Sequence, residues 1–109
     1  MVKCFMQDKT LIVEFEVFEL DHHITNEVRD KIDYILNTKK IIDIIFDFEK
    51  IRFMDSSGIG VIIGRYKKIA SEGGKVSIIG ANERVRKIFE LSGMTNIINI
   101  CDKESISSL

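Results

Sequence analysis

The sequence has little of what characterises nucleic-acid-binding or membrane proteins. Its 109 residues include no proline and no tryptophan, and 16 basic side chains nearly balance 17 acidic ones. This balance leaves no net field to attract nucleic acid or an anionic membrane, and no basic cluster is interleaved with aromatic residues. No apolar run approaches the roughly 20 residues that a helix needs to cross a bilayer. We therefore expect neither a nucleic-acid nor a membrane partner.

Cysteine is also scarce. The two cysteines, Cys4 and Cys101, lie at opposite ends of the chain, on predicted strands. They lack the spacing of metal ligands, and two cysteines do not make the disulfide framework of a secreted domain. We therefore expect buried, reduced thiols and no metal site. The N-terminal residues 1–3 do not have the architecture of a signal peptide, so the sequence predicts a cytoplasmic protein.

The hydrophobic periodicity predicts one α/β domain over residues 1–109. Strands are expected at residues 2–7, 10–18, 41–48, 76–79 and 97–101. Helices are expected at residues 24–37, at residues 57–72 and from residue 82 to Gly93. The order ββαβαβαβ implies a mixed, mostly parallel sheet with helices packed around it and an antiparallel hairpin at one edge. Residues 102–109 read as a polar tail, with at most a loose helical turn.

Small polar residues lie at the start of each predicted helix and are candidate N-caps. Thr25 or Asn26 is a candidate for the first helix, and Asn82 for the third. For the second helix the candidates are Ser56 and Ser57, in an Asp-Ser-Ser-Gly turn that follows a buried strand. A phosphate on such a serine would lie at the positive end of the helix dipole.

The predicted C-terminal ends of the strands carry an acidic rim around these serines. In an open parallel sheet, functional groups gather at those ends, which here supply Asp21, Asp47 and Asp55. In one interpretation a partner kinase phosphorylates Ser56, and the phosphate adds about −1.5 to −2 charge beside the rim. Taken alone, however, the turn favours a simple helix cap over a switch.

Two enzymatic interpretations are weaker. The three aspartates are a possible Mg²⁺ site for aspartyl phosphorylation, but no lysine follows the strand at residues 76–79. Gly58, Gly60 and Gly64 are a possible phosphate cradle, but their spacing is not G-x-G-x-x-G and no G-K-[ST] occurs. The pair His22-His23 reads as a solvated turn, because adjacent histidines point in different directions and no third ligand is suitably spaced.

Two glycines inside the second predicted helix are unusual, because each costs up to about 1 kcal/mol relative to alanine. At 100° per residue, Gly60, Gly64 and Lys67 share a strip beside the buried stripe, flanked by Val61 and Lys68. Such a strip allows another backbone to approach closely. That backbone is either a neighbouring strand of the fold or a docking partner, and periodicity leaves both open.

One long segment resembles a known signature. Residues 53–67 read FMDSSGIGVIIGRYK, which resembles the signature of the anti-sigma factor antagonists of the STAS domain family, most closely the sporulation (sigma F) type. Residues 19–23 (ELDHH) and 85–94 (VRKIFELSGM) resemble further segments of the same family, so the similarity spans roughly residues 3–101. Phe18 stands where a glycine is common in the family, and Asp47 where a close relative has asparagine.

The resemblance implies a non-enzymatic anti-anti-sigma factor with no catalytic residue, cofactor or metal. Unphosphorylated members bind a dimeric anti-sigma factor that is also a serine kinase, and thereby release the sigma factor. The kinase phosphorylates the first serine of Asp-Ser-Ser, here Ser56, which leaves Ser57 as the helix cap. A PP2C-type phosphatase that requires a divalent metal resets the switch. Asp21 matches the family aspartate that faces the kinase.

The expected partner-binding surface combines the serine turn, the Asp21 hinge and the exposed side of the second helix. It comprises Asp21, Asp55, Ser56, Ser57, Gly60, Val61, Gly64, Lys67 and Lys68. The free protein is expected to be a monomer. Two alternatives stay open: a different anti-sigma kinase, for example one of general stress control, and a small Mg²⁺- or nucleotide-dependent enzyme.

Overall fold

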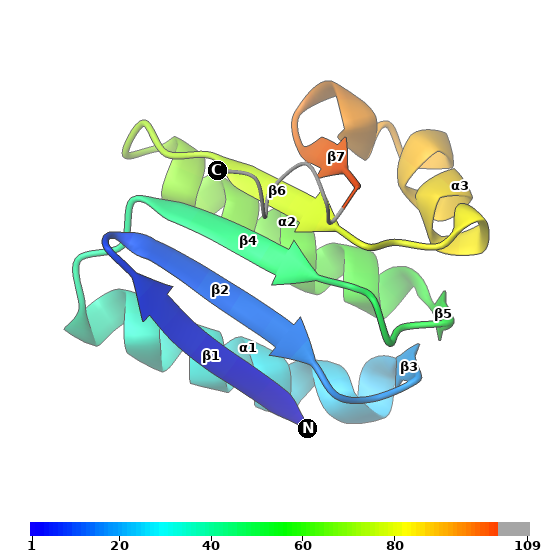
Figure 1. Ribbon diagram of the computed structural model, residues 1–109, viewed down its shortest axis with the longest axis horizontal. Helices are drawn as coiled ribbons and strands as arrows, with labels where there is room; N and C mark the ends of the chain where they lie inside the picture. Colours follow the sequence, from blue (N-terminus) through cyan, green and yellow to red (C-terminus); the bar gives the residue numbers. More distant parts are fainter. Residues whose placement is uncertain (103–109) are drawn as a thin grey trace.

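Five strands form one mixed sheet in the computed structural model, which describes residues 1–102 (Figure 1). They are β1 (Val2–Gln7), β2 (Thr10–Phe15), β4 (Asp43–Asp47), β6 (Val76–Ile79) and β7 (Asn99–Cys101). The spatial order is β1-β2-β4-β6-β7, and only the β1–β2 pair is antiparallel. The predicted mixed, mostly parallel sheet with an antiparallel edge is therefore confirmed. The polar tail lies outside the described residues, apart from Asp102.

Two long helices pack side by side against one face of this sheet (Figure 1). They are α1 (His22–Thr38) and α2 (Ser56–Ala70). A shorter helix, α3 (Glu83–Leu91), contacts the 3₁₀ turn η1 (Met94–Asn96), which leads into β7. The 3₁₀ turn makes the last strand shorter than predicted, and β4 is likewise shorter than the apolar run at residues 41–48.

The core contains a chain of four phenylalanine rings, each fully buried. Phe15 of β2 stacks on Phe46 of β4 and meets the edge of Phe48, with ring centroids 6.1 and 5.1 Å apart. Phe48 in turn meets Phe89 of α3 at 5.6 Å. Such aromatic pairs stabilise by about 0.5–1.5 kcal/mol beyond the apolar area that they bury. The chain of rings therefore ties α3 to the centre of the sheet.

A second, two-stranded sheet was not predicted from the sequence. It pairs β3 (Glu19–Leu20) with β5 (Phe53–Met54) in parallel. Leu20 and Met54 are buried in the core. Leu20 is followed by Asp21 and then by α1, and Met54 is followed by Asp55 and then by α2. The predicted strand at residues 10–18 therefore ends at Phe15, because the chain turns away to form β3. This small sheet fixes the starts of α1 and α2 next to each other.

Local sequence signals explain the ends of the elements. The side chain of Asn82 accepts a hydrogen bond from the N–H of Val85 at 2.8 Å, so the predicted cap of α3 is confirmed. After α2 the chain turns at Gly74, where a Cβ atom would lie 1.8 Å from the carbonyl oxygen of Ile42.

Cys4 and Cys101 are free thiols but only half-buried, so the prediction of buried thiols was too strong.

Candidate functional site

Two helices begin side by side, and each is capped by an aspartate. The side chain of Asp21 accepts a hydrogen bond from the N–H of His23 at 3.0 Å. The side chain of Asp55 accepts one from the N–H of Ser57 at 2.9 Å. The N–H of Asp55 also donates to the carbonyl oxygen of Leu20 at 3.3 Å, which links the two turns. Both carboxylates thus lie at positive helix N-termini, where negative charge is stabilising.

These caps differ from the predicted ones. Thr25 is buried inside α1 and Asn26 is exposed on it, so neither caps that helix. Ser57 is the second residue of α2 and not its cap. The cause is that each aspartate directly precedes its helix with an extended backbone, so its short carboxylate reaches the N–H two residues further on.

The two serines of the turn have different surroundings. Ser57 is half-buried, and its hydroxyl donates to the Oδ1 atom of Asp55 in a short hydrogen bond. Ser56 is the first residue of α2 and is exposed, and its hydroxyl makes no hydrogen bond within residues 1–102. The hydroxyl of Ser56 is therefore accessible to another molecule, whereas that of Ser57 is occupied.

The electrostatics of the turn keep Asp55 ionised. The hydrogen bond from the Ser57 hydroxyl lowers the pKa of Asp55 below its usual value of 3.8, and the backbone N–H groups of Ser57, His22 and Gly58 lower it further. The Nδ1 atom of His22 lies 3.7 Å from the other carboxylate oxygen of Asp55. A negative charge therefore stands next to the exposed Ser56 hydroxyl.

Asp47 does not join this acidic rim. It is 4% exposed at the end of β4, and its Oδ1 atom accepts a hydrogen bond from the N–H of Glu49 at 2.9 Å. The rim therefore consists of Asp21 and Asp55, and the prediction of three rim aspartates was wrong. Within the part of the chain that the structure describes, no three His, Cys, Asp or Glu side chains gather as a metal site requires.

The structure separates the glycines of α2 by role. A Cβ atom on Gly60 or Gly64 would meet no atom within 4 Å, so no neighbouring strand of the fold requires either glycine. Gly58 is different, because a Cβ atom there would lie 3.1 Å from the carbonyl oxygen of Leu20. Close packing inside the fold thus explains Gly58, and it does not explain the other two.

The rest of the predicted docking side of α2 is only partly exposed. Lys67 and Lys68 are exposed in the last turn of the helix, and Gly60 is exposed near its start. Val61 is 6% exposed and packs into the core, so its predicted place on an exposed strip was wrong. The reason is that α2 packs against α1 as well as the sheet, which widens its buried side.

Comparison with known proteins assigns this fold and turn to a family. The sequence profile of the STAS domain matches residues 7–105. The chain belongs to the STAS domain family. An anti-sigma F factor antagonist of Paenibacillus polymyxa is 38% identical to it over 86 residues, which make up 79% of this chain and 74% of the relative. This relative places the STAS chain among the anti-sigma factor antagonists, which are regulatory proteins and not enzymes.

Two solved STAS structures show how close the fold is. The anti-sigma factor antagonist SpoIIAA in its unphosphorylated form has a TM-score of 0.84 at 29% identity, covering 97% of this chain and 92% of that one. The phosphorylated form of SpoIIAA from Bacillus has a TM-score of 0.78 at 28% identity, covering 99% and 97%. The predicted family and fold are therefore confirmed. Within residues 1–102 of this STAS domain, no helix is long and apolar enough to span a membrane.

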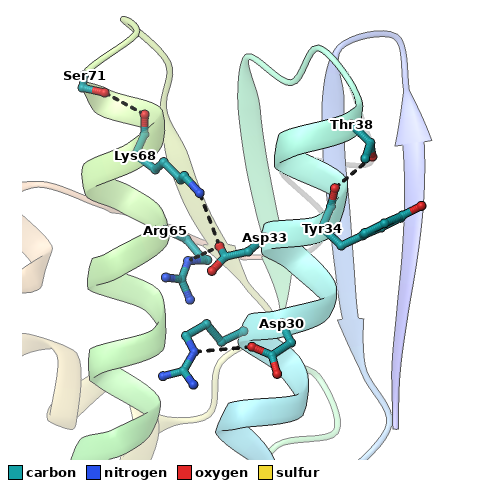
Figure 2. A network of polar contacts seen from close by, with 8 residues as sticks. Asp30, Asp33, Tyr34, Thr38, Arg65, Lys68 and Ser71 are labelled. Atoms are coloured by element: carbon teal, nitrogen blue, oxygen red, sulfur yellow. Dashed lines mark hydrogen bonds and ion pairs between the residues drawn. The ribbon is translucent and has the colours of Figure 1, made fainter.

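Sequence reasoning missed one partly buried ion pair of the STAS domain. Arg65 of α2 is 9% exposed, and its Nε atom lies 3.2 Å from the Oδ1 atom of Asp33 of α1 (Figure 2). The Nζ atom of Lys68 lies 3.9 Å from the same oxygen. Burial lowers the pKa of Arg65, while the charge of Asp33 opposes that change. Helical spacing gave no clear signal for this pair, because Arg65 lies one turn after Val61, which the sequence pattern placed on the exposed strip.

A groove of about 640 Å³ runs between α1 and α2 beside the serine turn of the STAS domain. Its walls are formed by His22, Thr25, Asn26 and Arg29 of α1 and by Ser57, Gly60, Val61 and Arg65 of α2. Three of the predicted partner-binding residues, Ser57, Gly60 and Val61, thus border one hollow of the surface. The lining contains basic side chains and no carboxylate.

Proposed function

We propose that the protein is an anti-anti-sigma factor that is switched by phosphorylation of Ser56. The unphosphorylated form binds a dimeric anti-sigma factor of the sigma F type in the cytoplasm and releases the sigma factor. That anti-sigma factor is also the serine kinase that phosphorylates Ser56, and a PP2C-type phosphatase reverses the modification. The observation that carries this proposal is the exposed, unbonded hydroxyl of Ser56 beside the bonded hydroxyl of Ser57.

The position of Ser56 suits a switch that changes binding and preserves the fold. A phosphate adds about −1.5 to −2 charge and three acceptor oxygens, and the N-terminus of α2 stabilises such a charge. The same charge lies beside Asp55 and close to the neighbouring cap Asp21, so it repels a partner that approaches with an acidic or apolar surface. The solved phosphorylated form of SpoIIAA, with its TM-score of 0.78, supports a modification that the fold tolerates.

The proposed docking surface surrounds this turn. It comprises Asp21, Asp55, Ser56, Ser57, Gly60, Gly64, Lys67 and Lys68, whereas Val61 is buried and is left out. Gly60 and Gly64 support the assignment, because each costs up to about 1 kcal/mol of helix stability and neither has a packing reason within the fold. An interface of ordinary size, about 800 Å² per partner, would cover these residues together.

Intact-mass analysis tests the acceptor. After incubation with ATP and the sigma F-type anti-sigma kinase of the same organism, the protein should gain one phosphate. Ser56→Ala should abolish this gain, and the matched control Ser57→Ala should keep it. A phosphate that persists in Ser56→Ala would contradict the assignment. Turnover of ATP or GTP by the purified protein alone would contradict a purely regulatory role.

A further inference from the structure

The groove between α1 and α2 has a one-sided charge. Among the side chains that line it, His22, Arg29 and Arg65 can carry positive charge, and none is acidic. Each of these cations has a carboxylate nearby that is not among the lining residues: Asp55 lies 3.7 Å from His22, Asp30 lies 3.8 Å from Arg29, and Asp33 lies 3.2 Å from Arg65. Lys68, at 3.9 Å from Asp33, adds a further positive charge nearby. The hollow therefore favours an anionic occupant.

Arg65 is short of hydrogen-bond acceptors inside the fold. Its Nε and Nη1 atoms are buried without a hydrogen bond, since the contact with Asp33 lacks hydrogen-bond geometry. A guanidinium carries five N–H donors, and leaving buried donors unpaired is costly. Arg65 lines the groove with a side chain that is 11% exposed, so an acceptor that enters the groove approaches a guanidinium whose one ion pair within residues 1–102 is the contact with Asp33.

The groove also has room for a partner and adjoins the proposed docking surface. Gly60 forms part of its wall, and a Cβ atom there would meet nothing within 4 Å. Ser57 and Gly60 belong both to the groove and to the docking surface around Ser56. A segment that covers the serine turn can therefore extend into the groove without rearrangement of the fold.

We propose that this groove receives an acidic side chain of the anti-sigma factor, recognised by Arg29 at the rim and Arg65 at the base. The inference rests on the proposed function and names the chemistry of its partner. Recognition of a carboxylate in the groove also gives the phosphorylation switch an electrostatic cause. A phosphate on Ser56 lies next to Ser57 in the groove wall, so it repels the incoming carboxylate and competes for the same cations.

A charge reversal at the rim tests the groove. The side chain of Arg29 is 47% exposed, so Arg29→Glu should fold normally. In calorimetric titration against the anti-sigma factor, this variant should bind about tenfold more weakly than wild type. The matched control is Lys87→Glu, which reverses an exposed charge on α3, outside the groove, and should bind as wild type. Thermal unfolding should show that both variants are as stable as the wild-type protein.

The possible outcomes are distinct. If wild type binds and Arg29→Glu binds equally well, the groove assignment is wrong while the proposed function stands. If wild type does not bind the anti-sigma factor, both are wrong. A photo-crosslinking amino acid in place of Asn26, which lines the groove and is exposed, should capture a partner peptide that contains aspartate or glutamate. Capture of a peptide without either residue, or no capture despite normal binding, would overturn the inference.

Discussion

Ser57 donates its hydroxyl hydrogen to Asp55, the residue that caps α2. This bond makes the two adjacent serines of the turn unequal, because it holds one side chain in the structure and leaves the hydroxyl of Ser56 exposed. The same carboxylate also accepts the backbone N–H of Ser57. Asp55 therefore both caps α2 and determines which serine hydroxyl stays free for phosphorylation. Variants of Asp55, Ser56 and Ser57 can separate these two roles.

Removal of the Asp55 cap should destabilise the protein. We expect Asp55→Ala to cost about 1 kcal/mol of unfolding free energy, which corresponds to a fall in melting temperature of about 4–8 °C. Asparagine caps helices as well as aspartate, so Asp55→Asn should cost much less. Thermal unfolding followed by circular dichroism measures both variants. Equal losses would mean that the charge of Asp55, and not its capping, stabilises α2.

Acidification should remove the contribution of Asp55. Because its pKa is lower in the folded protein than its usual value of 3.8, ionised Asp55 stabilises the fold above that value. This stabilisation is lost as the pH falls through the folded pKa. The melting temperature of wild type should therefore fall more steeply between about pH 5 and pH 2 than that of Asp55→Asn. Parallel curves for the two proteins would contradict this assignment.

Negative charge at position 56 should affect binding more than stability. Ser56→Asp should weaken binding to the anti-sigma factor and leave the melting temperature close to that of wild type, because the new charge lies at a helix N-terminus. Ser57→Asp is the contrasting variant. It places a carboxylate against Asp55 in a half-buried position and should lower the melting temperature clearly. A large loss of stability in Ser56→Asp would indicate a mainly structural role for this serine.

The glycines of α2 should respond in opposite ways to substitution by alanine. Gly60→Ala and Gly64→Ala should each stabilise the protein by up to about 1 kcal/mol, because the methyl group meets open space and alanine favours the helix. Both should weaken binding to the anti-sigma factor. Gly58→Ala should destabilise the protein, since its methyl group would lie 3.1 Å from the carbonyl oxygen of Leu20. Urea unfolding and titration together test this contrast.

The ion pair between α1 and α2 should show coupling. Asp33→Ala leaves the buried Arg65 without its counter-ion and should cost about 1–3 kcal/mol. The double variant Asp33→Ala/Arg65→Met replaces the buried cation by an apolar side chain and should recover part of this loss. Urea unfolding of the two single variants and the double variant measures the coupling energy. Strictly additive losses would mean that the pair contributes little.

Periodic sequence patterns predicted the large elements, while tertiary contacts decided the details. The five main strands, three helices and mixed sheet follow from hydrophobic spacing and from Asn82 as a cap. The pair β3 and β5 was missed because two-residue strands have no detectable period. They form only because Leu20 and Met54 are buried together.

The sequence predicted the serine turn and the Asp21 hinge of the candidate site, but not the helix caps or the packing around Val61 and Arg65. The Asp-Ser-Ser-Gly turn and the Asp21 hinge lie close together as expected. The helix caps are Asp21 and Asp55 and not the predicted residues, because the extended backbone of each aspartate lets its side chain reach the helix N-terminus. The burial of Val61 was wrongly predicted and the ion pair of Arg65 was missed, because a single helix pattern does not reveal the packing of α2 against α1. The groove is likewise a property of two helices that are distant in sequence.

The most direct test compares two forms of one protein. The unphosphorylated protein and the same protein fully phosphorylated on Ser56 are titrated against the anti-sigma factor, with the modified residue mapped by mass spectrometry. The account predicts tight binding by the unphosphorylated form, at least about tenfold weaker binding (~1.4 kcal/mol) by the phosphorylated form, and recovery after treatment with a PP2C-type phosphatase. Equal binding by the two forms would contradict it.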